Sequence, residues 1–390
     1  MSLDWEEYRN DFPIVKNCTY LNNAAISPIP KTVYNEVVKF YQDSLYYGGK
    51  KWIDWEKKIE LTRNLFAKFI GASSPDEIAF THSTSEGMNI FSHMLSSKGV
   101  VILNRLEFPS SNLPWINNNK ENIRYVKTTN NNEIKITDIS ELIEKTNSTN
   151  PKNCVKTIVT SHVQYSTGFK QDLIDLSKLS KKYGIFLVIN ATQSIGSIDF
   201  NVKELDIDFM CTNGHKWMLS SFGIGIIYIK NIYLRNSIGF RPKFFSQSGQ
   251  KDKNLYSINT KLLISHTATR FEIGSPNLPN IIALNASLKY LSQIGIRKIE
   301  KRILKLTDYL IEKLKSINLK ILSPISNRNS RSGIILFQSK NIKPLKVTKI
   351  LEKKYNIIVS ARGNGIRVSP HFYNNEKDID RLISALEKIF

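Results

Sequence analysis

One lysine stands in a sequence context that suits covalent chemistry. Lys216 lies in the segment Thr-Asn-Gly-His-Lys-Trp, residues 212–217, between an apolar run that ends at Cys211 and another that begins near Gly223. An amine at the end of a buried strand is withdrawn from water and can form a Schiff base with an aldehyde. On these residues alone, the alternative that Lys216 is an ordinary surface lysine stays open.

Two other segments place polar side chains directly after apolar runs. Ser83 and Glu86 form a capping box at the start of a predicted helix. The free amides there, with the hydroxyls of Thr84 and Ser85, could bind a phosphate. Residues 189–196 end a second apolar run with amide side chains. Helix capping and strand-end turns would explain both segments without any ligand.

The histidines, glycines and cysteines argue against other kinds of site. No two of the six histidines have the spacing of an HExxH zinc motif, and no glycine pair has the third glycine of a dinucleotide-binding loop. The three cysteines form no CxxC pair, so neither a thiolate zinc site nor a disulfide framework is suggested. We therefore expect no metal site, and a reducing, cytoplasmic compartment.

The elements that must position these segments follow an α/β pattern. Short runs rich in Val, Ile and Leu are typical of strands buried on both faces of a sheet, and helical segments such as residues 172–183 lie between them. The runs predict strands at residues 77–81, 100–103, 123–127, 155–161, 185–190, 207–211 and 224–229. Together they predict a doubly wound α/β domain.

The regions on either side of this core suggest two further parts. Amphipathic helices precede it, and after Pro279 a long apolar-striped helix is followed by short strands and helices, which predicts a smaller α+β domain. We expect an N-terminal segment at residues 1–25, a large domain at residues 26–285 and a small C-terminal domain at residues 286–390.

Composition excludes disorder and argues against two kinds of partner. The 390 residues are 41% hydrophobic, as in globular proteins. The net charge of +21 raises the hypothesis of a nucleic-acid binder, but the lysines are scattered and form no block of like charges. No run of eighteen apolar residues occurs, so no membrane span is predicted. We expect neither a nucleic-acid nor a membrane partner.

The segments at residues 83–86, 189–196 and 212–217, in this order along the chain, resemble the motifs of a known enzyme group. This is the class V branch of the fold-type-I pyridoxal-phosphate enzymes, which includes cysteine desulfurases, selenocysteine lyases and isopenicillin N epimerases. The resemblance runs from residues 20–25 to residues 367–374. It implies an α/β large domain with a mostly parallel seven-stranded sheet flanked by helices, and a smaller α+β C-terminal domain. It also implies pyridoxal 5'-phosphate as cofactor and an amino acid or small amine as substrate.

The resemblance assigns the catalytic and substrate-binding residues. Lys216 matches the lysine that holds the cofactor as a Schiff base and later moves the α-proton of the substrate. Arg367 matches the arginine that binds the substrate carboxylate with two parallel hydrogen bonds, a geometry that lysine cannot copy. The motif at residues 20–25 adds Asn23 and Ala25 to the predicted substrate-binding residues.

The cofactor-binding residues implied by the resemblance are Thr84, Ser85, Phe108, Tyr165, Asn190, Gln193, Asn213, His215 and Ser275. Those that match the phosphate site are Thr84, Ser85, Asn213 and His215. Gln193 matches a residue that bonds the phenolic oxygen, Tyr165 lies along the same edge, and Phe108 takes the place of a stacked histidine. Ser275 matches a position that reaches the phosphate of the neighbouring subunit, which implies a homodimer with the active site at the interface.

Two departures from the family pattern bear on the reaction. Asn190 stands where the family usually has the aspartate that keeps the pyridine nitrogen protonated, so a weaker electron sink is expected. This disfavours transamination more than racemisation or β-elimination. Residues 360–367 are short and lack the nucleophilic cysteine of desulfurases. The sequence therefore predicts an enzyme other than a persulfide-forming desulfurase. Aminotransferase, C–S or C–Se lyase, epimerase and non-catalytic fold relative remain as alternatives.

Overall fold

The apolar runs form one seven-stranded sheet with the order β2-β8-β7-β6-β5-β3-β4. Its strands are β2 (Ile78–Thr81), β3 (Val100–Leu103), β4 (Ile123–Tyr125), β5 (Val155–Ser161), β6 (Phe186–Asn190), β7 (Phe209–Asn213) and β8 (Gly225–Ile229). Strand β8 runs antiparallel to both neighbours, and every other adjacent pair is parallel. The computed structural model describes residues 3–235, 242–244, 246 and 264–390. The predicted mostly parallel seven-stranded sheet is confirmed.

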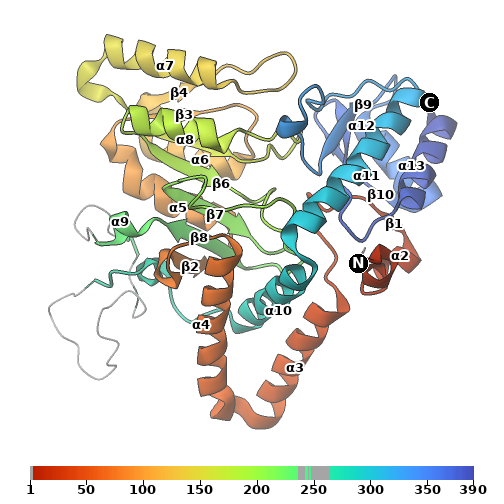
Figure 1. Ribbon diagram of the computed structural model, residues 1–390, viewed down its shortest axis with the longest axis horizontal. Coiled ribbons are helices and arrows are strands. Elements are labelled where there is room, and N and C mark those ends of the chain that lie inside the picture. Colours follow the sequence, from red (N-terminus) through yellow and green to blue (C-terminus); the bar gives the residue numbers. More distant parts are fainter. Residues whose placement is uncertain (1–2, 236–241, 245, 247–263) are drawn as a thin grey trace.

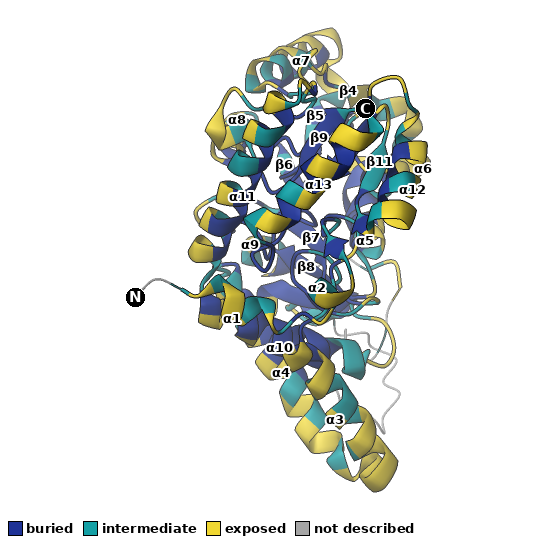
Figure 2. Cartoon of the chain, turned by 90° about the vertical axis from the view of Figure 1, so that its right-hand side faces the viewer, coloured by how far each residue is buried: buried dark blue, intermediate teal, exposed yellow. Residues whose placement is uncertain are grey.

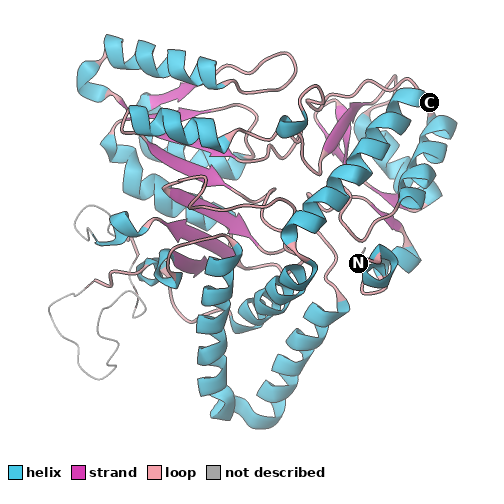
Figure 3. Ribbon diagram, viewed as in Figure 1, coloured by secondary structure: helices cyan, strands magenta, loops and turns pink. Residues whose placement is uncertain are grey.

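Helices cover both faces of this sheet (Figure 3). One face packs against α4 (Trp52–Phe69), α7 (Ile136–Thr149), α8 (Leu173–Lys182) and α10 (Leu278–Ile294). The other face packs against α5 (Thr84–Leu95), α6 (Pro109–Asn119) and α9 (Asn231–Arg235). Side chains alternate between the two hydrophobic clusters along a strand, since Ile78 and Phe80 join the first and Ala79 joins the second. Burial on both faces explains why the strands are continuously apolar in sequence.

A long helical hairpin extends away from the sheet. It consists of α3 (Lys31–Tyr47) and α4, joined by a 3₁₀ turn, η1 (Gly48–Lys51). Figure 2 shows its far end as mostly exposed. Large apolar side chains are exposed along the hairpin, namely Tyr34, Tyr41, Leu45, Tyr46, Tyr47, Trp52, Ile53 and Leu61. Their exposure leaves this surface available for packing against another molecule.

The small domain lies on the side of the sheet where the parallel strands have their carboxyl ends, and α11 (Ile296–Ser316) leads into it (Figure 1). It contains β9 (Ile335–Gln338), α12 (Pro344–Tyr355), β10 (Ile357–Ile358), β11 (Ser360–Arg362), β12 (Gly365–Val368) and α13 (Glu376–Ile389). Helix α11 belongs to both cores, because Ile303 packs in the large cluster and Leu306 in the small one. The division predicted at residues 285/286 remains a prediction.

The N-terminal residues pack against both domains, because Phe12 joins the hydrophobic cluster of the large sheet and Leu21 joins that of the small domain. They form α1 (Trp5–Arg9), α2 (Ile14–Asn17) and β1 (Thr19–Tyr20), and β1 pairs in parallel with β10. The Arg9 guanidinium donates to both carboxylate oxygens of Asp378, at 2.7 and 2.9 Å. The remaining 3₁₀ turns are η2 (Pro75–Glu77), η3 (Ser96–Lys98), η4 (Lys120–Asn122), η5 (Pro151–Asn153), η7 (Ala268–Phe271) and η8 (Arg328–Ser330). Within the described ranges, no helix has the length and apolar character needed to cross a membrane.

Candidate active site

The predicted site residues follow strands that end at one edge of the sheet. Strands β2, β3, β5, β6 and β7 all point the same way, so their carboxyl ends meet at this edge. Ligands of open α/β sheets bind outside the carboxyl ends of the strands. Thr84 follows β2, Phe108 follows β3, and Tyr165 follows β5. Asn190 ends β6, and Lys216 comes three residues after β7.

Lys216 lies in a tight turn with a desolvated amine. The turn is closed by backbone hydrogen bonds from Leu219 to Lys216 and from Ser220 to Gly214, both of 2.9 Å. A side chain at Gly214 would come within 2.6 Å of Ile224, so the turn packs closely on the residue that precedes β8. Burial, followed by the charges of two arginines, lowers the pKa of Lys216 to about 7. Much of this amine is therefore neutral near pH 7, as attack on an aldehyde requires.

The residue after the lysine is held by three other segments. Trp217 donates its indole N–H to Gln193 Oε1 at 2.7 Å, and Gln193 Nε2 donates to the carbonyl of Ala24 at 2.9 Å. His371 Nδ1 accepts the amide of Phe372 at 2.9 Å, so its Nε2 carries the proton and donates to the Trp217 carbonyl at 3.1 Å. Burial lowers the pKa of His371 to about 4, which keeps this ring neutral. These contacts fix the direction of the lysine.

A buried cationic group lies close to the lysine. Arg367, which is 1% exposed, donates from Nη1 to the carbonyl of Tyr165 at 2.7 Å. Its Nε and Nη2 atoms have no hydrogen-bond partner within the part of the chain that the structure describes. Burial and the neighbouring charge of Arg362 lower the pKa of Arg367, although a guanidinium remains protonated at neutral pH. Unsatisfied buried donors of this kind favour binding of an anion, such as a carboxylate.

The start of α5 forms a second polar region at this edge. Thr84 Oγ1 lies 2.8 Å from Thr192 Oγ1 and accepts a hydrogen bond from Asn213 Nδ2 at 3.1 Å. Asn213 Oδ1 is buried and has no partner among the described residues. Ser85 is exposed, at the first turn of the helix. The structure thus brings Thr84 and Asn213 into contact at a helix N-terminus, where backbone amides attract anions.

Aromatic residues lie beside the lysine. The Phe108 ring is 45% exposed and packs edge-on against Tyr165, with ring centroids 5.2 Å apart. Lys216 Nζ lies 5.8 Å from the Phe108 centroid. His215 stacks on Phe222 at 4.4 Å, and burial together with the charge of Lys216 lowers the pKa of His215 to about 4. His215 is therefore a neutral aromatic surface at pH 7.

Asn190 is oriented by two neighbours. Its Nδ2 donates to Ser111 Oγ at 2.8 Å, and its Oδ1 accepts the amide of Thr192 at 3.0 Å. An aspartate in this position could keep both contacts, because the serine hydroxyl can donate as well as accept. The local geometry therefore accommodates either residue, and the absence of charge is the main difference.

Glu107 has a structural role that the sequence did not reveal. Its carboxylate is buried and accepts hydrogen bonds from the Ser161 amide at 2.6 Å, from Gln164 Nε2 at 2.7 Å and from Asn104 Nδ2 at 2.8 Å. The Ser161 hydroxyl also donates to it. These bonds join the segments after β3 and β5 and so position Phe108. Only its place beside Phe108 could have suggested this role.

Of the three remaining predicted residues, two lie in a segment whose Ser27 amide donates to the carbonyl of the residue before the lysine, at 3.0 Å, and the third lies on an exposed surface. Asn23 is fully buried, and its Oδ1 accepts from Ser27 Oγ at 3.0 Å and from Tyr373 OH at 2.9 Å. Ala25 is partly buried in the same segment. Ser275 is exposed and lines a groove of about 1110 Å³ along α4. The substrate and cofactor roles of these residues stay predictions.

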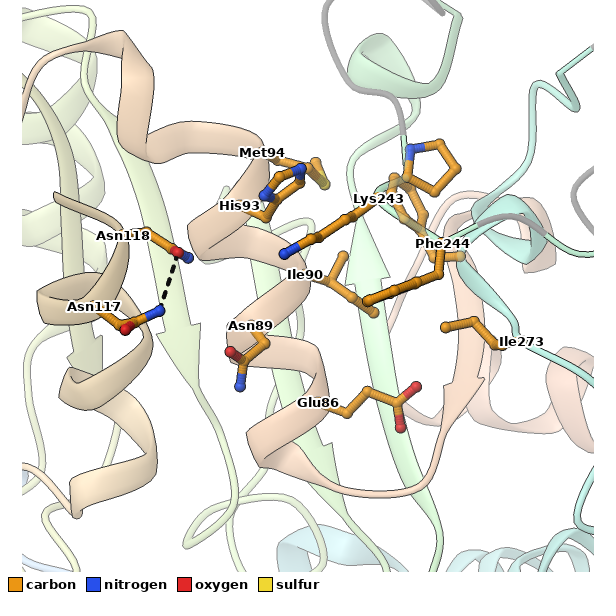
Figure 4. Close-up of a pocket in the computed structure, with 12 residues that line it drawn as sticks. Glu86, Asn89, Ile90, His93, Met94, Asn117, Asn118, Lys243, Phe244 and Ile273 are labelled. Carbon is orange, nitrogen blue, oxygen red and sulfur yellow. Dashed lines mark hydrogen bonds between the residues drawn. The ribbon is translucent and has the colours of Figure 1, made fainter.

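A smaller hollow of about 160 Å³ lies along α5 and has different lining residues (Figure 4). Ile90 and Met94 contribute apolar surface, and Lys243 reaches toward them from the opposite wall. Asn117 donates to Asn118 at 3.4 Å at its rim. None of the predicted site residues lines this hollow.

The three cysteines of the chain lie outside the segment that carries Arg367. Cys211 is buried within β7, and burial raises the pKa of its thiol. Cys154 precedes β5 and so lies at the opposite edge of the sheet. Cys18 lies between α2 and β1, where burial and then the charge of Asp378 raise its pKa. Neither pKa shift favours a reactive thiolate.

Known proteins resemble the chain over nearly its whole length. A probable cysteine desulfurase from Borreliella burgdorferi is 31% identical, with 98% of this chain and 95% of that protein covered. The apo structure of a cysteine desulfurase from Thermococcus onnurineus NA1 is 25% identical, with a TM-score of 0.86 and coverage of 100% and 98%. The cystine C–S lyase C-DES, solved with its product cysteine persulfide, shares the fold at 19% identity, with a TM-score of 0.85 and coverage of 96% and 98%.

These names bear on one of the predictions from sequence. The missing loop cysteine predicted an enzyme other than a persulfide-forming desulfurase, and the comparisons do not support this prediction, because relatives carry the desulfurase name. The resemblance to class V enzymes is confirmed: the model of the family described as aminotransferase class-V matches residues 19–382. The chain therefore belongs to the aminotransferase class V family of pyridoxal-phosphate enzymes.

Proposed function

We propose that the protein is a pyridoxal-phosphate-dependent lyase that cleaves the C–S bond of a sulfur-containing amino acid and releases the sulfur directly. The observation that carries the proposal is the hairpin of β11 and β12, which brings Arg367 to the lysine without any cysteine in residues 360–367. The desulfurase names of relatives support sulfur amino acids as substrates. The absence of a cysteine from residues 360–367 supports direct release of sulfur.

The residues at the edge of the sheet fit the cofactor. The neutral amine of Lys216 suits attachment of the aldehyde, and the N-terminus of α5 with Thr84 suits the phosphate. We assign Ser85 and His215 to the phosphate side, Asn190 to the pyridine nitrogen, and Gln193 and Tyr165 to the phenolic edge, as the family pattern suggests. When bound, pyridoxal phosphate supplies an aldehyde for amines and an electron-withdrawing ring.

The protein side chains then have separate tasks in the reaction. Arg367 binds the α-carboxylate through its free Nε and Nη2 atoms and so fixes the substrate. Lys216 accepts the proton from the α-carbon, because its lowered pKa makes it a base near neutral pH. Phe108 and Tyr165 cover one side of the site and limit access of water.

Asn190 favours elimination over transamination in this proposal. It has no charge with which to keep the pyridine nitrogen protonated, so electrons from the α-carbon are stored less well on the ring. A sulfur leaving group at Cβ accepts these electrons at once. Asparagine in place of aspartate at position 190 should therefore slow C–S cleavage less than it slows amino-group transfer.

The products distinguish direct elimination from desulfuration. Elimination from L-cysteine takes up water and gives pyruvate, ammonia and sulfide, whereas desulfuration gives alanine and leaves sulfur on a thiol. The purified protein with pyridoxal phosphate should produce pyruvate from L-cysteine or L-cystine in equal amount to ammonia. Alanine as the main product would contradict the proposal. Formation of D-cysteine, without pyruvate or alanine, would indicate an epimerase.

A lysine variant provides the control. Lys216→Ala should abolish both turnover and the lysine adduct that borohydride reduction traps on the wild-type protein, while binding of free cofactor persists in part. Wild-type protein that gains no adduct with pyridoxal phosphate would support the non-catalytic alternative.

We further propose that two copies associate through the groove along α4. The exposed apolar residues of the α3–α4 hairpin and the exposed position of Ser275 beside this groove support a homodimer with the phosphate side at the interface. Light scattering should give about twice the monomer mass of 44.7 kDa. A cytoplasmic location and the lack of nucleic-acid partners stay predictions of the sequence.

A further inference from the structure

The hairpin of β11 and β12 carries more unsatisfied donors than one carboxylate needs. Ser360 pairs with Arg367, and Arg362 pairs with Gly365. Residues directly opposite in an antiparallel pair share a face, and so do residues two apart in one strand. Ser360, Arg362 and Arg367 therefore all project from the same face of the hairpin.

Each of these three side chains has a buried polar atom without a partner in the described ranges of the chain. The atoms are Ser360 Oγ, Arg362 Nε, and both Nε and Nη2 of Arg367. Arg362 uses Nη1 on the carbonyl of Ala361, at 2.7 Å, and forms no ion pair with a described carboxylate. Buried donors without acceptors are costly, so each of these atoms is expected to bind either an ordered water or a ligand.

Arg362 also lies near the lysine. Its charge contributes to lowering the pKa of both Lys216 and Arg367, so it lies near both groups. Three basic side chains thus converge without a carboxylate among them. One α-carboxylate, bound by Arg367, neutralises a single positive charge and leaves Arg362 without a counter-ion.

We propose that Arg362, together with Ser360, forms a second anion subsite that selects substrates with a negatively charged group on the side chain. Arg362 and Arg367 are diagonal neighbours on the hairpin, an arrangement in which the residues lie about 7–8 Å apart and their β-carbons somewhat closer. This spacing suits the two acidic groups of a short diacid amino acid. The subsite rests on the proposed function only in taking Arg367 as the ligand of the α-carboxylate.

Equilibrium binding of non-reactive acids tests the subsite apart from catalysis. Succinate and butyrate both have four carbons and differ in one carboxylate, and neither has an amine that could react. We would measure their binding to the protein loaded with pyridoxal phosphate by titration calorimetry at low ionic strength. Succinate should bind about tenfold or more tightly than butyrate, as expected for one added charge-assisted contact.

Substitutions assign the preference to the hairpin. Arg362→Gln should remove most of the preference for succinate and leave butyrate binding within about twofold, and Arg362→Lys should retain part of it. Arg381→Gln is the matched control, because Arg381 is an exposed arginine on α13. Circular dichroism checks that each variant is folded, and if Arg362→Gln does not fold, the Lys variant decides.

Two results would overturn the subsite. The first is that the wild-type protein binds succinate and butyrate with equal affinity, or binds neither. The second is that a folded Arg362 variant keeps the full preference for succinate. The proposed function fails separately. A protein that prefers succinate but converts no amino acid would refute the lyase and leave the subsite standing. A protein that cleaves C–S bonds but does not prefer succinate would refute the subsite and leave the lyase standing.

Discussion

Replacing Lys216 by methionine should stabilise the cofactor-free protein, and by an amount that depends on pH. The folded state holds the amine at a pKa of about 7, against 10.5 for an ordinary lysine. Between these two values the unfolded chain binds a proton that the folded chain does not, so the lysine lowers the free energy of unfolding. This penalty is largest below pH 7 and disappears as the pH rises past 10.5.

The size of the effect follows from the two pKa values. One unit of pKa shift corresponds to about 1.4 kcal/mol, and the linkage relation gives a penalty of about 4 kcal/mol at pH 7 and about 2 kcal/mol at pH 9. Methionine has a similar length and no charge, so Lys216→Met removes the whole penalty. The gain in unfolding free energy should therefore be about 2 kcal/mol larger at pH 7 than at pH 9.

Urea unfolding of both proteins at the two pH values measures this difference, and it cancels any effect of methionine packing that is independent of pH. The exposed Lys203 provides the control, since Lys203→Met should change stability by nearly the same amount at both pH values. If Lys216→Met raised the unfolding free energy equally at pH 7 and pH 9, the account of a desolvated amine would be refuted. A decrease in unfolding free energy seen only at pH 7 would refute it too.

Three further substitutions test the other parts of the site. Arg367→Gln should raise KM for amino-acid substrates about 10- to 100-fold with a smaller change in kcat, because a charged bidentate contact is lost. Steady-state kinetics measure this change, with Arg381→Gln as the control, and an unchanged KM would show that the assignment of Arg367 is wrong. Asn190→Asp should increase half-transamination of L-alanine by about tenfold or more while it changes elimination less, as measured by cofactor absorbance; equal effects would remove the electron-sink argument. Glu107→Gln should lower unfolding free energy by about 2–4 kcal/mol, because an amide cannot accept from all the donors around it, and a loss below about 0.5 kcal/mol in denaturant unfolding would show that those bonds are unimportant.

The sequence predicts the sheet well because its strands are buried on both faces. An uninterrupted apolar run is visible without tertiary information, and the runs at residues 100–103 and 155–161 coincide with β3 and β5. Strand β7 was harder to delimit. The apolar run stops at Cys211, yet the polar residues Thr212 and Asn213 continue to pair with β8. Their backbone groups form the ladder whatever their side chains are.

The site is predicted in part, because motifs identify residue types and not their partners. Thr84 and Lys216 follow strands that end at one edge of the large sheet, and Arg367 reaches this edge from β12 through its bond to Tyr165, while the roles of all three stay predictions. Gln193, in contrast, is bonded to Trp217 and Ala24, which are distant in sequence. Glu107 is one acidic residue among 34, and only the fold places its donors around it. Contacts of this kind depend on the approach of separate strands and leave no periodic pattern.

The pairing of β1 with β10 constrains how the protein is made. Residues 19–20 leave the ribosome more than 300 residues before residues 357–358, their partners in the two-stranded sheet. During synthesis the early segment must wait without its strand partner, and the ion pair between Arg9 and Asp378 closes later still. The large sheet is encoded between them and can assemble first. Completion of the small domain is thus a late event that locks the segment carrying Asn23 against Ser369, beside the arginine hairpin.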